Sequence, residues 1–365
     1  MKTIMEIFSK ETPLDLLSSG EIRFPPLKLR LVERQPKGLG ASVDATVEVQ
    51  WDRKAQLFVL ECRTRTTPRA LEEAASRAKL AAVPPDSYPM VLVPHLSEEN
   101  LRRLEDLQVS GLDLNGNGYV SVPGQLLILR SGSPNRFSQP QPLANPYRGS
   151  ASLVARTLLI YSEFPTAKDI LLAAQKRGAA SLSLGTVSKA LQGLADDLVV
   201  DRSGRKITVT DSELLLQKLV QNFRAPRVTG KLTGKCPLER IDYVLAQRAN
   251  SNLKLIPTGR WSAQAYAAAA RSGPFSLYCS NLNLFLEFAS PGGFEEDEFF
   301  PDLEILETTD AAVYFDGRTS EHDQYTWSSP VQSYLELMSG GEKREREIAE
   351  QVRKAIAPRA WPGIE

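Results

Sequence analysis

Two carboxylates and a cation stand at the ends of two neighbouring predicted strands. Asp44 lies near the start of the strand predicted over residues 43–51, Glu61 lies near the end of the next strand, and Arg63 follows two positions later. Because side chains alternate between the faces of a strand, Glu61 and Arg63 point to the same side, and a hairpin could bring Asp44 beside Glu61. Two carboxylates can bind Mg²⁺ or Mn²⁺, which activates a water, while the cation stabilises charge on a phosphate. The chemistry would be metal-dependent cleavage of DNA.

Arginine at the third position limits this chemistry. Its guanidinium stays protonated and cannot act as a base, although it can clamp a phosphate. The sequence favours a group that only binds or has a structural role, without a cofactor. An active deoxyribonuclease stays open as the alternative, with Asp44 and Glu61 as ligands of Mg²⁺ or Mn²⁺ and with Asp44, Glu61 and Arg63 as its catalytic residues.

A second group of side chains is typical of nucleic-acid binding. The first turns of a helix predicted over residues 183–196 carry small hydroxyl groups and a lysine, namely Ser183, Thr186, Ser188 and Lys189. Its apolar residues, Leu184 among them, are predicted to face the opposite way. The turn of the hairpin that follows carries three cations, Arg202, Arg205 and Lys206. Short polar side chains at the start of a recognition helix can reach base edges, and a basic hairpin can contact phosphates.

The elements around this second group follow a recognisable order. An amphipathic helix is predicted over residues 150–163, and a second helix, residues 166–177, begins at the capping residue Thr166. Helix, helix, turn, helix and basic hairpin is the order of a winged helix-turn-helix, and the stretch SLGTVSKALQGLADDLVV resembles winged-helix regulators. The resemblance implies double-stranded DNA as the partner, and a homodimer if the DNA site is a palindrome. Use of the winged helix for protein contacts is the alternative.

Residues 1–135 supply the elements around the carboxylates. The predicted strands cover residues 24–32, 43–51, 56–62 and 89–93 and three short stretches between residues 111 and 129. One helix is predicted to open at Thr67, with Pro68 in its first turn, and another at the capping residue Ser97; residues 115–118 are predicted to form a tight turn. The order predicts an α/β sandwich and resembles the PD-(D/E)XK restriction-endonuclease-like fold, as does the D…ExK pattern, in which Arg63 replaces the lysine. The resemblance implies a nuclease fold.

The C-terminal third carries two segments of unusual order and spacing, LIPTGRWSAQAYA and SSPVQSYLELMSGGEKREREIAEQVRKAI. They resemble the C-terminal domain of the AbiEi family of type IV antitoxins, bacterial proteins that pair this domain with a winged helix. The resemblance implies a repressor of its own operon that counteracts a nucleotidyltransferase-like toxin in phage defence without stably binding it. Strands are predicted over residues 274–278, 284–288 and 311–315, helices over residues 263–271 and 342–357, and a solvated acidic run over residues 294–300.

Composition narrows the class of protein. The chain has 365 residues with 44 Lys and Arg against 44 Asp and Glu, which argues against a protein that is basic all over. Three scattered cysteines and two histidines do not match the spacing of a zinc site. No leader segment or membrane span is expected, so we predict a cytoplasmic protein with no membrane partner. Breaks near residues 131–149 and 224–237 predict three domains, residues 1–135, 150–225 and 230–365.

The sequence as a whole predicts a multidomain α/β and α+β protein. The expected function is that of a DNA-binding transcriptional regulator that carries an inactive nuclease-like domain. A magnesium-dependent endonuclease acting in phage defence or DNA repair is the alternative. A protein-interaction scaffold that binds no DNA is a third interpretation.

Overall fold

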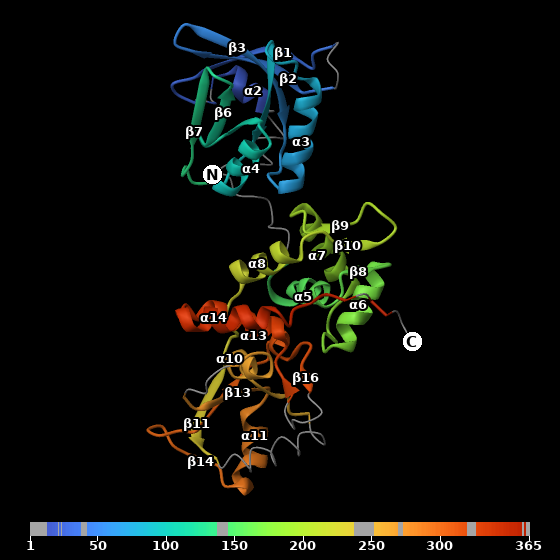
Figure 1. Cartoon of the computed structure of the whole chain (residues 1–365), viewed down its shortest axis with the longest axis vertical. Coiled ribbons are helices and arrows are strands. Elements are labelled where there is room, and N and C mark those ends of the chain that lie inside the picture. The colour runs from blue at the N-terminus through green and yellow to red at the C-terminus, as the bar shows by residue number, and fades with distance from the viewer. Residues whose placement is uncertain are drawn as a thin grey trace. The chain divides into compact units, whose positions relative to one another are not determined.

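The computed structural model describes residues 13–20, 22, 24–37, 42–136, 145–236, 252–268, 273–319, 326–359 and 361–362 (Figure 1). The chain forms two compact units, residues 1–142 with residues 196–198, and residues 143–195 with residues 199–365. The expected division of the second unit near residue 230 stays a prediction.

The first unit is built on a seven-stranded mixed sheet in which the strands follow one another in chain order. The strands are β1 (Lys28–Arg34), β2 (Ala45–Trp51), β3 (Lys54–Cys62), β4 (Ser87–Val93), β5 (Ser110–Asp113), β6 (Gly118–Val122) and β7 (Leu126–Arg130). Strands β3, β4 and β5 run parallel to one another, and the other neighbours are antiparallel. The prediction of a mixed α and β architecture is therefore confirmed for this unit.

Helices cover both faces of this sheet, because the central strands have apolar side chains on both faces. In β4, Met90 and Leu92 belong to one hydrophobic cluster, and Val91 and Val93 belong to another. The second cluster contains buried residues of α3 (Pro68–Ala81) and α4 (Glu98–Asp106), and the first contains Leu17 of α2 (Pro13–Ser18). The sheet thus separates two layers of core.

Local capping fixes where these helices begin, as predicted. The Thr67 hydroxyl accepts a hydrogen bond from the Ala70 amide at 3.3 Å. Ser97 accepts one from the Asn100 amide at 3.2 Å in the same way. Each interaction satisfies an amide that the first turn of a helix leaves without a partner.

The predicted turn at residues 115–118 is also present between β5 and β6. The Asp113 carboxylate, which is buried, accepts hydrogen bonds from the amides of Asn115 and Asn117, both at 2.8 Å. Gly116 has φ +91°, a conformation that glycine adopts without strain. The turn is therefore held by a neighbouring carboxylate and needs no phosphate to order it.

The second unit begins with four helices and a small sheet. The helices are α5 (Ser152–Ile160), α6 (Ala167–Lys176), α7 (Leu184–Asp196) and α8 (Ser212–Asn222). The strands β8 (Glu163–Phe164), β9 (Val200–Asp201) and β10 (Ile207–Val209) form a sheet in the order β8-β10-β9. Thr166 caps α6 by accepting a hydrogen bond from the Asp169 amide at 3.3 Å, as predicted.

The helix predicted within residues 150–163 is present as α5, but the expectation that it is amphipathic is wrong. Every residue of α5 is buried, because it lies in a core formed by other helices and strands of the unit. The same core includes residues of α13 (Pro330–Gly340) and α14 (Lys343–Arg353), which lie over 100 residues away in the chain. The segment predicted as a winged helix and the C-terminal helices therefore share one hydrophobic core.

The remainder of the second unit contains a five-stranded sheet in the order β12-β13-β15-β11-β14. Its strands are β11 (Gly230–Lys235), β12 (Leu255–Pro257), β13 (Phe275–Cys279), β14 (Glu295–Glu296) and β15 (Leu303–Glu307). Strands β13 and β15 are parallel, and the other pairs are antiparallel. A short hairpin, β16 (Arg318–Thr319) and β17 (Thr326–Trp327), precedes α13.

Two strand predictions in this region are wrong. Residues 284–288 lie in the helix α11 (Leu282–Ala289), and residues 311–314 form the helix α12 (Ala311–Tyr314). Asn281 accepts a hydrogen bond from the Leu284 amide, and Asp310 accepts one from the Ala312 amide, both at 2.9 Å. These caps start helices in short apolar runs whose pattern alone does not distinguish a strand from a helix.

The expected helix over residues 263–271 is shorter than predicted. A short helix, α10 (Gly259–Ser262), leads into a single 3₁₀ turn over Ala263–Ala265. Residues 269–271 of the expected helix lie outside the described residues.

In the described part of the chain, no helix combines the length and apolar character that crossing a bilayer requires.

Candidate functional site

The β2–β3 hairpin brings the two predicted carboxylates together. Its register pairs Ala45 with Leu60, which places Asp44 beside the end of β3. The Asp44 carboxylate accepts a hydrogen bond from the Cys62 amide at 2.7 Å. Glu61 lies next to it with 2 % of its surface exposed. The hairpin alone therefore produces the juxtaposition that the sequence predicted.

Arg63 lies between these carboxylates. Its Nη1 atom donates a hydrogen bond to Oε2 of Glu61 at 2.6 Å and lies 3.9 Å from Oδ2 of Asp44. Desolvation and the charge of Asp44 raise the pKa of Glu61, and the hydrogen bond from Arg63 opposes this rise. The guanidinium thus supplies the positive charge that a pair of neighbouring carboxylates requires.

This donor set does not fit a divalent ion well. Arg63 places a positive charge 2.6 Å from Glu61 and 3.9 Å from Asp44, and this charge would repel a divalent ion bound between the two carboxylates. Among the described residues, no cluster of three or more His, Cys, Asp or Glu side chains has an arrangement that could hold a metal ion. Arg63 thus balances the local charge at Asp44 and Glu61 without a metal.

A pocket of about 490 Å³ lies beside the carboxylates, lined by Leu14, Arg34, Gln35, Asp44, Cys62, Arg63 and Thr64. Desolvation and the two nearby carboxylates raise the pKa of the Cys62 thiol, so this thiol is a poor nucleophile. Arg34 donates a hydrogen bond to Asp15 at 2.6 Å. Its charge is therefore already paired. The charged groups that line the pocket are therefore paired within the protein.

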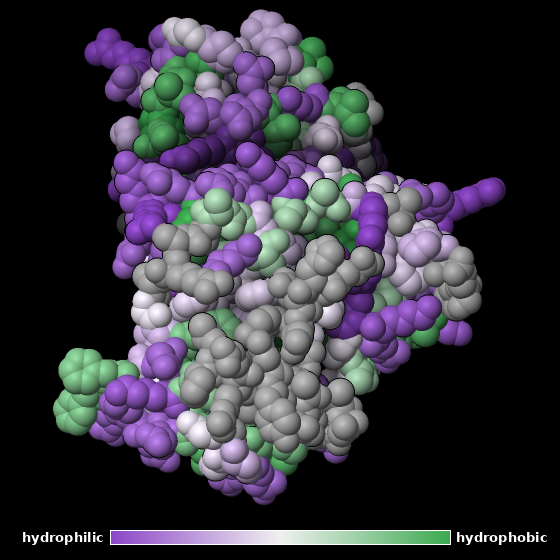
Figure 2. Space-filling model, turned by 60° about the horizontal axis from the view of Figure 1, so that its bottom comes forward, coloured by the Kyte–Doolittle hydropathy of each residue, from purple (hydrophilic) through white to green (hydrophobic). Residues whose placement is uncertain are grey.

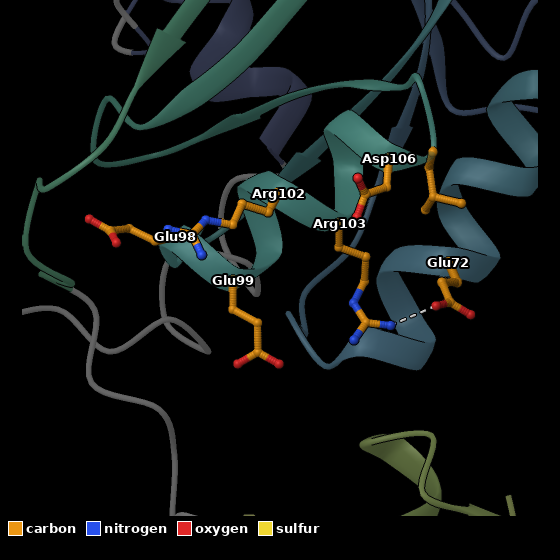
Figure 3. Close-up of a pocket in the computed structure, with 7 residues that line it drawn as sticks. Glu72, Glu98, Glu99, Arg102, Arg103 and Asp106 are labelled. Carbon is orange, nitrogen blue, oxygen red and sulfur yellow. Dashed lines mark hydrogen bonds and ion pairs between the residues drawn. The ribbon is translucent and has the colours of Figure 1, made fainter. Parts of the chain in front are cut away.

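A larger hollow of about 610 Å³ lies on α3 and α4 and contains none of the residues predicted from the sequence. Arg103 donates a hydrogen bond to Glu72 at 2.7 Å across the two helices, while Glu98 points away from this pair (Figure 3). Charges of both signs line the hollow and lie in reach of solvent. The pattern is that of a solvated helix surface.

The predicted recognition helix presents most of its expected residues to solvent. Ser183 and Thr186 lie at the start of α7, where the Ser183 hydroxyl accepts a hydrogen bond from the Thr186 amide at 3.2 Å. Ser188 and Lys189 are exposed in the next turn. Leu184 is 47 % exposed, so its predicted place on the buried face is wrong. It is the first residue of α7, at the exposed end of the helix.

The predicted wing has a well-ordered turn. The Asp201 carboxylate accepts hydrogen bonds from the amide and hydroxyl of Ser203 at 2.8 and 2.7 Å. Arg202 and Arg205 are exposed and form no ion pair within the part of the chain that the structure describes. Lys206 is also exposed but lies 2.9 Å from a carboxylate oxygen of Glu163. Two free arginines thus remain on this hairpin.

Of six further cations that could extend a DNA-facing surface, three are paired. Lys231 lies 2.6 Å from Glu304, and Lys235 lies 3.0 Å from Asp297. On α14, Arg353 pairs with Glu213 at 2.7 Å. Three other arginines remain exposed, Arg227, Arg344 and Arg346. The paired residues add little positive field for a phosphate backbone.

The two segments that carry the AbiEi resemblance meet in the structure. The Pro257 carbonyl accepts hydrogen bonds from the hydroxyls of Ser262 at 3.0 Å and Ser328 at 2.8 Å. The Gly259 amide donates to Glu336 at 2.7 Å, and a Cβ on Gly259 would lie 2.8 Å from that carboxyl group. Their residue types are therefore explained by packing between β12, α10 and α13.

A buried polar network lies next to the contact between α10 and α13, and it was not predicted from the sequence. Arg156 of α5 donates hydrogen bonds to Gln332 at 2.8 Å and to the Ala312 carbonyl at 3.3 Å. Gln332 in turn donates to Glu336 at 2.6 Å. Desolvation lowers the pKa of Arg156 to about 10 and raises the pKa of Glu336. The one available signal was an arginine inside the apolar run SLVARTLLI.

Comparison with known proteins adds no relative to these observations. No family model, no curated protein and no solved structure matches the chain.

Proposed function

We propose that the chain is a transcriptional regulator that binds double-stranded DNA through residues 150–225, as a winged helix. The observation that carries this proposal is a pair of exposed arginines, Arg202 and Arg205, which have no ion pair among the described residues and lie on the hairpin that directly follows a helix with polar, exposed first turns. Residues of α7, β9 and β10, including Val187, Val200 and Ile207, belong to one core. That core would hold the helix and the hairpin in a fixed relation.

Each element has a distinct role in the proposed complex. Ser188 and Lys189 would contact base edges and phosphates from the major groove, while Thr186 and the capping Ser183 would lie at the entry of the helix. Arg202 and Arg205 would neutralise phosphates beside the groove. Lys206 would contribute less, because binding must compete with its ion pair to Glu163. A palindromic operator would require a homodimer.

The nuclease-like sheet would then have no catalytic function. Arg63 compensates Glu61 directly, which supports a structural or binding role over metal-dependent cleavage. No observation favours the endonuclease alternative. The antitoxin role and a nucleotidyltransferase-like toxin as functional counterpart rest on the AbiEi resemblance.

An electrophoretic mobility shift with the DNA upstream of the protein's own gene tests the proposal. A scrambled fragment of equal length is the control, and each binding reaction is run in EDTA and in Mg²⁺ or Mn²⁺. We expect a shift selective for the upstream fragment and intact DNA under all conditions. Metal-dependent loss of both fragments, abolished by Glu61→Gln, would overturn this ranking in favour of the nuclease.

A further inference from the structure

The loop between β14 and β15 exposes two adjacent aromatic side chains. Phe299 and Phe300 are 86 % and 78 % exposed, the largest fractions among the large hydrophobic side chains of the described residues. In Figure 2, a pale green, moderately hydrophobic group projects at the lower left beside purple, hydrophilic side chains. Contiguous exposed apolar groups on a folded protein often mark an interaction site.

The loop that carries these phenylalanines has a fixed shape. One oxygen of the Asp297 carboxylate accepts hydrogen bonds from the amides of Phe299 and Phe300 at 2.8 and 2.9 Å. Its other oxygen lies 3.0 Å from Nζ of Lys235. The phenylalanines are therefore presented on an ordered turn, so little conformational entropy remains to be lost when a partner binds.

Strand β11 supports both ends of this loop. The amides of Asp297 and Asp302 donate to the carbonyls of Thr233 and Gly234, both at 3.1 Å. Gly234 allows this close approach, because a Cβ there would lie 2.4 Å from the Glu295 carbonyl oxygen. The tip is thus anchored in the five-stranded sheet.

The charge around the two rings defines what could cover them. Glu295, Glu296 and Glu298 are exposed, and the carboxylate of Asp297 is the one in this run that a lysine neutralises. Such a rim repels nucleic acid and anionic lipid but favours cationic groups. We propose that Phe299 and Phe300 anchor a docking surface for a partner protein whose apolar groove is rimmed by lysine and arginine. This site is separate from the proposed DNA-binding residues.

A labelled amphipathic helical peptide is a defined probe of this chemistry. One version has a leucine face and a lysine face, and the matched version replaces each lysine with glutamate. Fluorescence anisotropy with the full chain should show binding of the lysine peptide alone. The double variant Phe299→Ser and Phe300→Ser should weaken that binding at least tenfold, because anchor side chains in pockets dominate an interface.

Two further variants make the test specific. Glu295→Gln with Glu298→Gln should weaken binding and reduce its salt dependence. Leu127→Ser with Leu129→Ser removes two other exposed apolar side chains, 69 % and 59 % exposed on β7, and should leave affinity unchanged. Unchanged thermal unfolding of all variants would show that they are folded.

Several results would overturn the proposal. The first is a lysine peptide that fails to bind or binds the phenylalanine variant equally well. Another is phenylalanine-dependent binding to phosphatidylcholine vesicles, which would assign the tip to a lipid surface. A third is phenylalanine-dependent dimerisation in sedimentation velocity, which would make a second copy the occupant.

Discussion

At the scale of single residues, Arg63 decides how the carboxylate pair behaves. Its guanidinium lies 2.6 Å from Glu61, which has 2 % of its side chain exposed, and it is itself 23 % exposed. Removing one partner of such a pair leaves a charge with little solvent around it, and that is more costly than losing the attraction alone. The residue that departs from the nuclease pattern is thus important for the fold.

We expect Arg63→Ala to lower the free energy of unfolding by about 2 kcal/mol at neutral pH, because it strands the Glu61 carboxylate. Without Arg63, desolvation and Asp44 still raise the pKa of Glu61 in the folded state. A carboxyl group with a raised pKa destabilises the fold once it ionises, so the loss should shrink as pH falls below that pKa. Urea denaturation between pH 4.5 and 8 measures this.

The matched control is Arg63→Lys, which retains the charge and should recover much of the stability. A loss for Arg63→Ala that stays the same at every pH would contradict the assigned role of Glu61. Equal stability of Arg63→Lys and Arg63→Ala would show that packing matters and charge does not.

At the scale of elements, variants in α7 and in the hairpin that follows it can test fold stability separately from the proposed DNA binding. Ser183 acts mainly as a cap, so Ser183→Ala should destabilise the unit by about 1 kcal/mol.

Lys189→Ala and Arg205→Ala should leave thermal unfolding unchanged. Each should reduce the salt slope of operator binding by about one unit, because each removes one phosphate contact.

Filter binding over a range of KCl concentrations measures these slopes, with Lys168→Ala, on another helix of the same unit, as the comparison. An unchanged slope in both Lys189→Ala and Arg205→Ala would remove α7 and the hairpin from the DNA interface.

Elements were predictable from the sequence where local chemistry determines them. Thr67, Ser97 and Thr166 cap the helices that the sequence assigned to them, and the alternation in residues 43–51 identified β2. The proximity of Asp44 and Glu61 followed from a short hairpin. These features depend on residues close together in the chain.

Features that depend on distant packing could not be predicted in this way. Helix α5 contains Arg156, which suggests an exposed face, yet its partner Gln332 lies 176 residues away. The apolar run of α11 could equally form a strand, and its helical state depends on a cap at Asn281 together with burial of Phe285. Periodicity alone carries no information on such tertiary partners.

At the scale of the whole molecule, the shared core argues that residues 150–225 do not fold independently. Helices α13 and α14 contribute Val331, Tyr334, Leu335, Leu337, Ala349 and Val352 to the core beneath α5. Removing residues 330–365 would expose this apolar surface and leave Arg156 without Gln332. Exposing this apolar surface to water costs about 25 cal/mol per Å², and this cost would act against folding.

We therefore expect a chain that ends at residue 329 to lose DNA binding although it keeps every residue of α7 and the hairpin. Its second unit should lose most of its helical signal in circular dichroism, while the seven-stranded sheet of the first unit remains folded. Adding residues 330–365 as a separate peptide should restore helicity, because the peptide can refill the core. A truncated chain that binds operator DNA with unchanged affinity would contradict this, and would make residues 150–225 a domain in their own right.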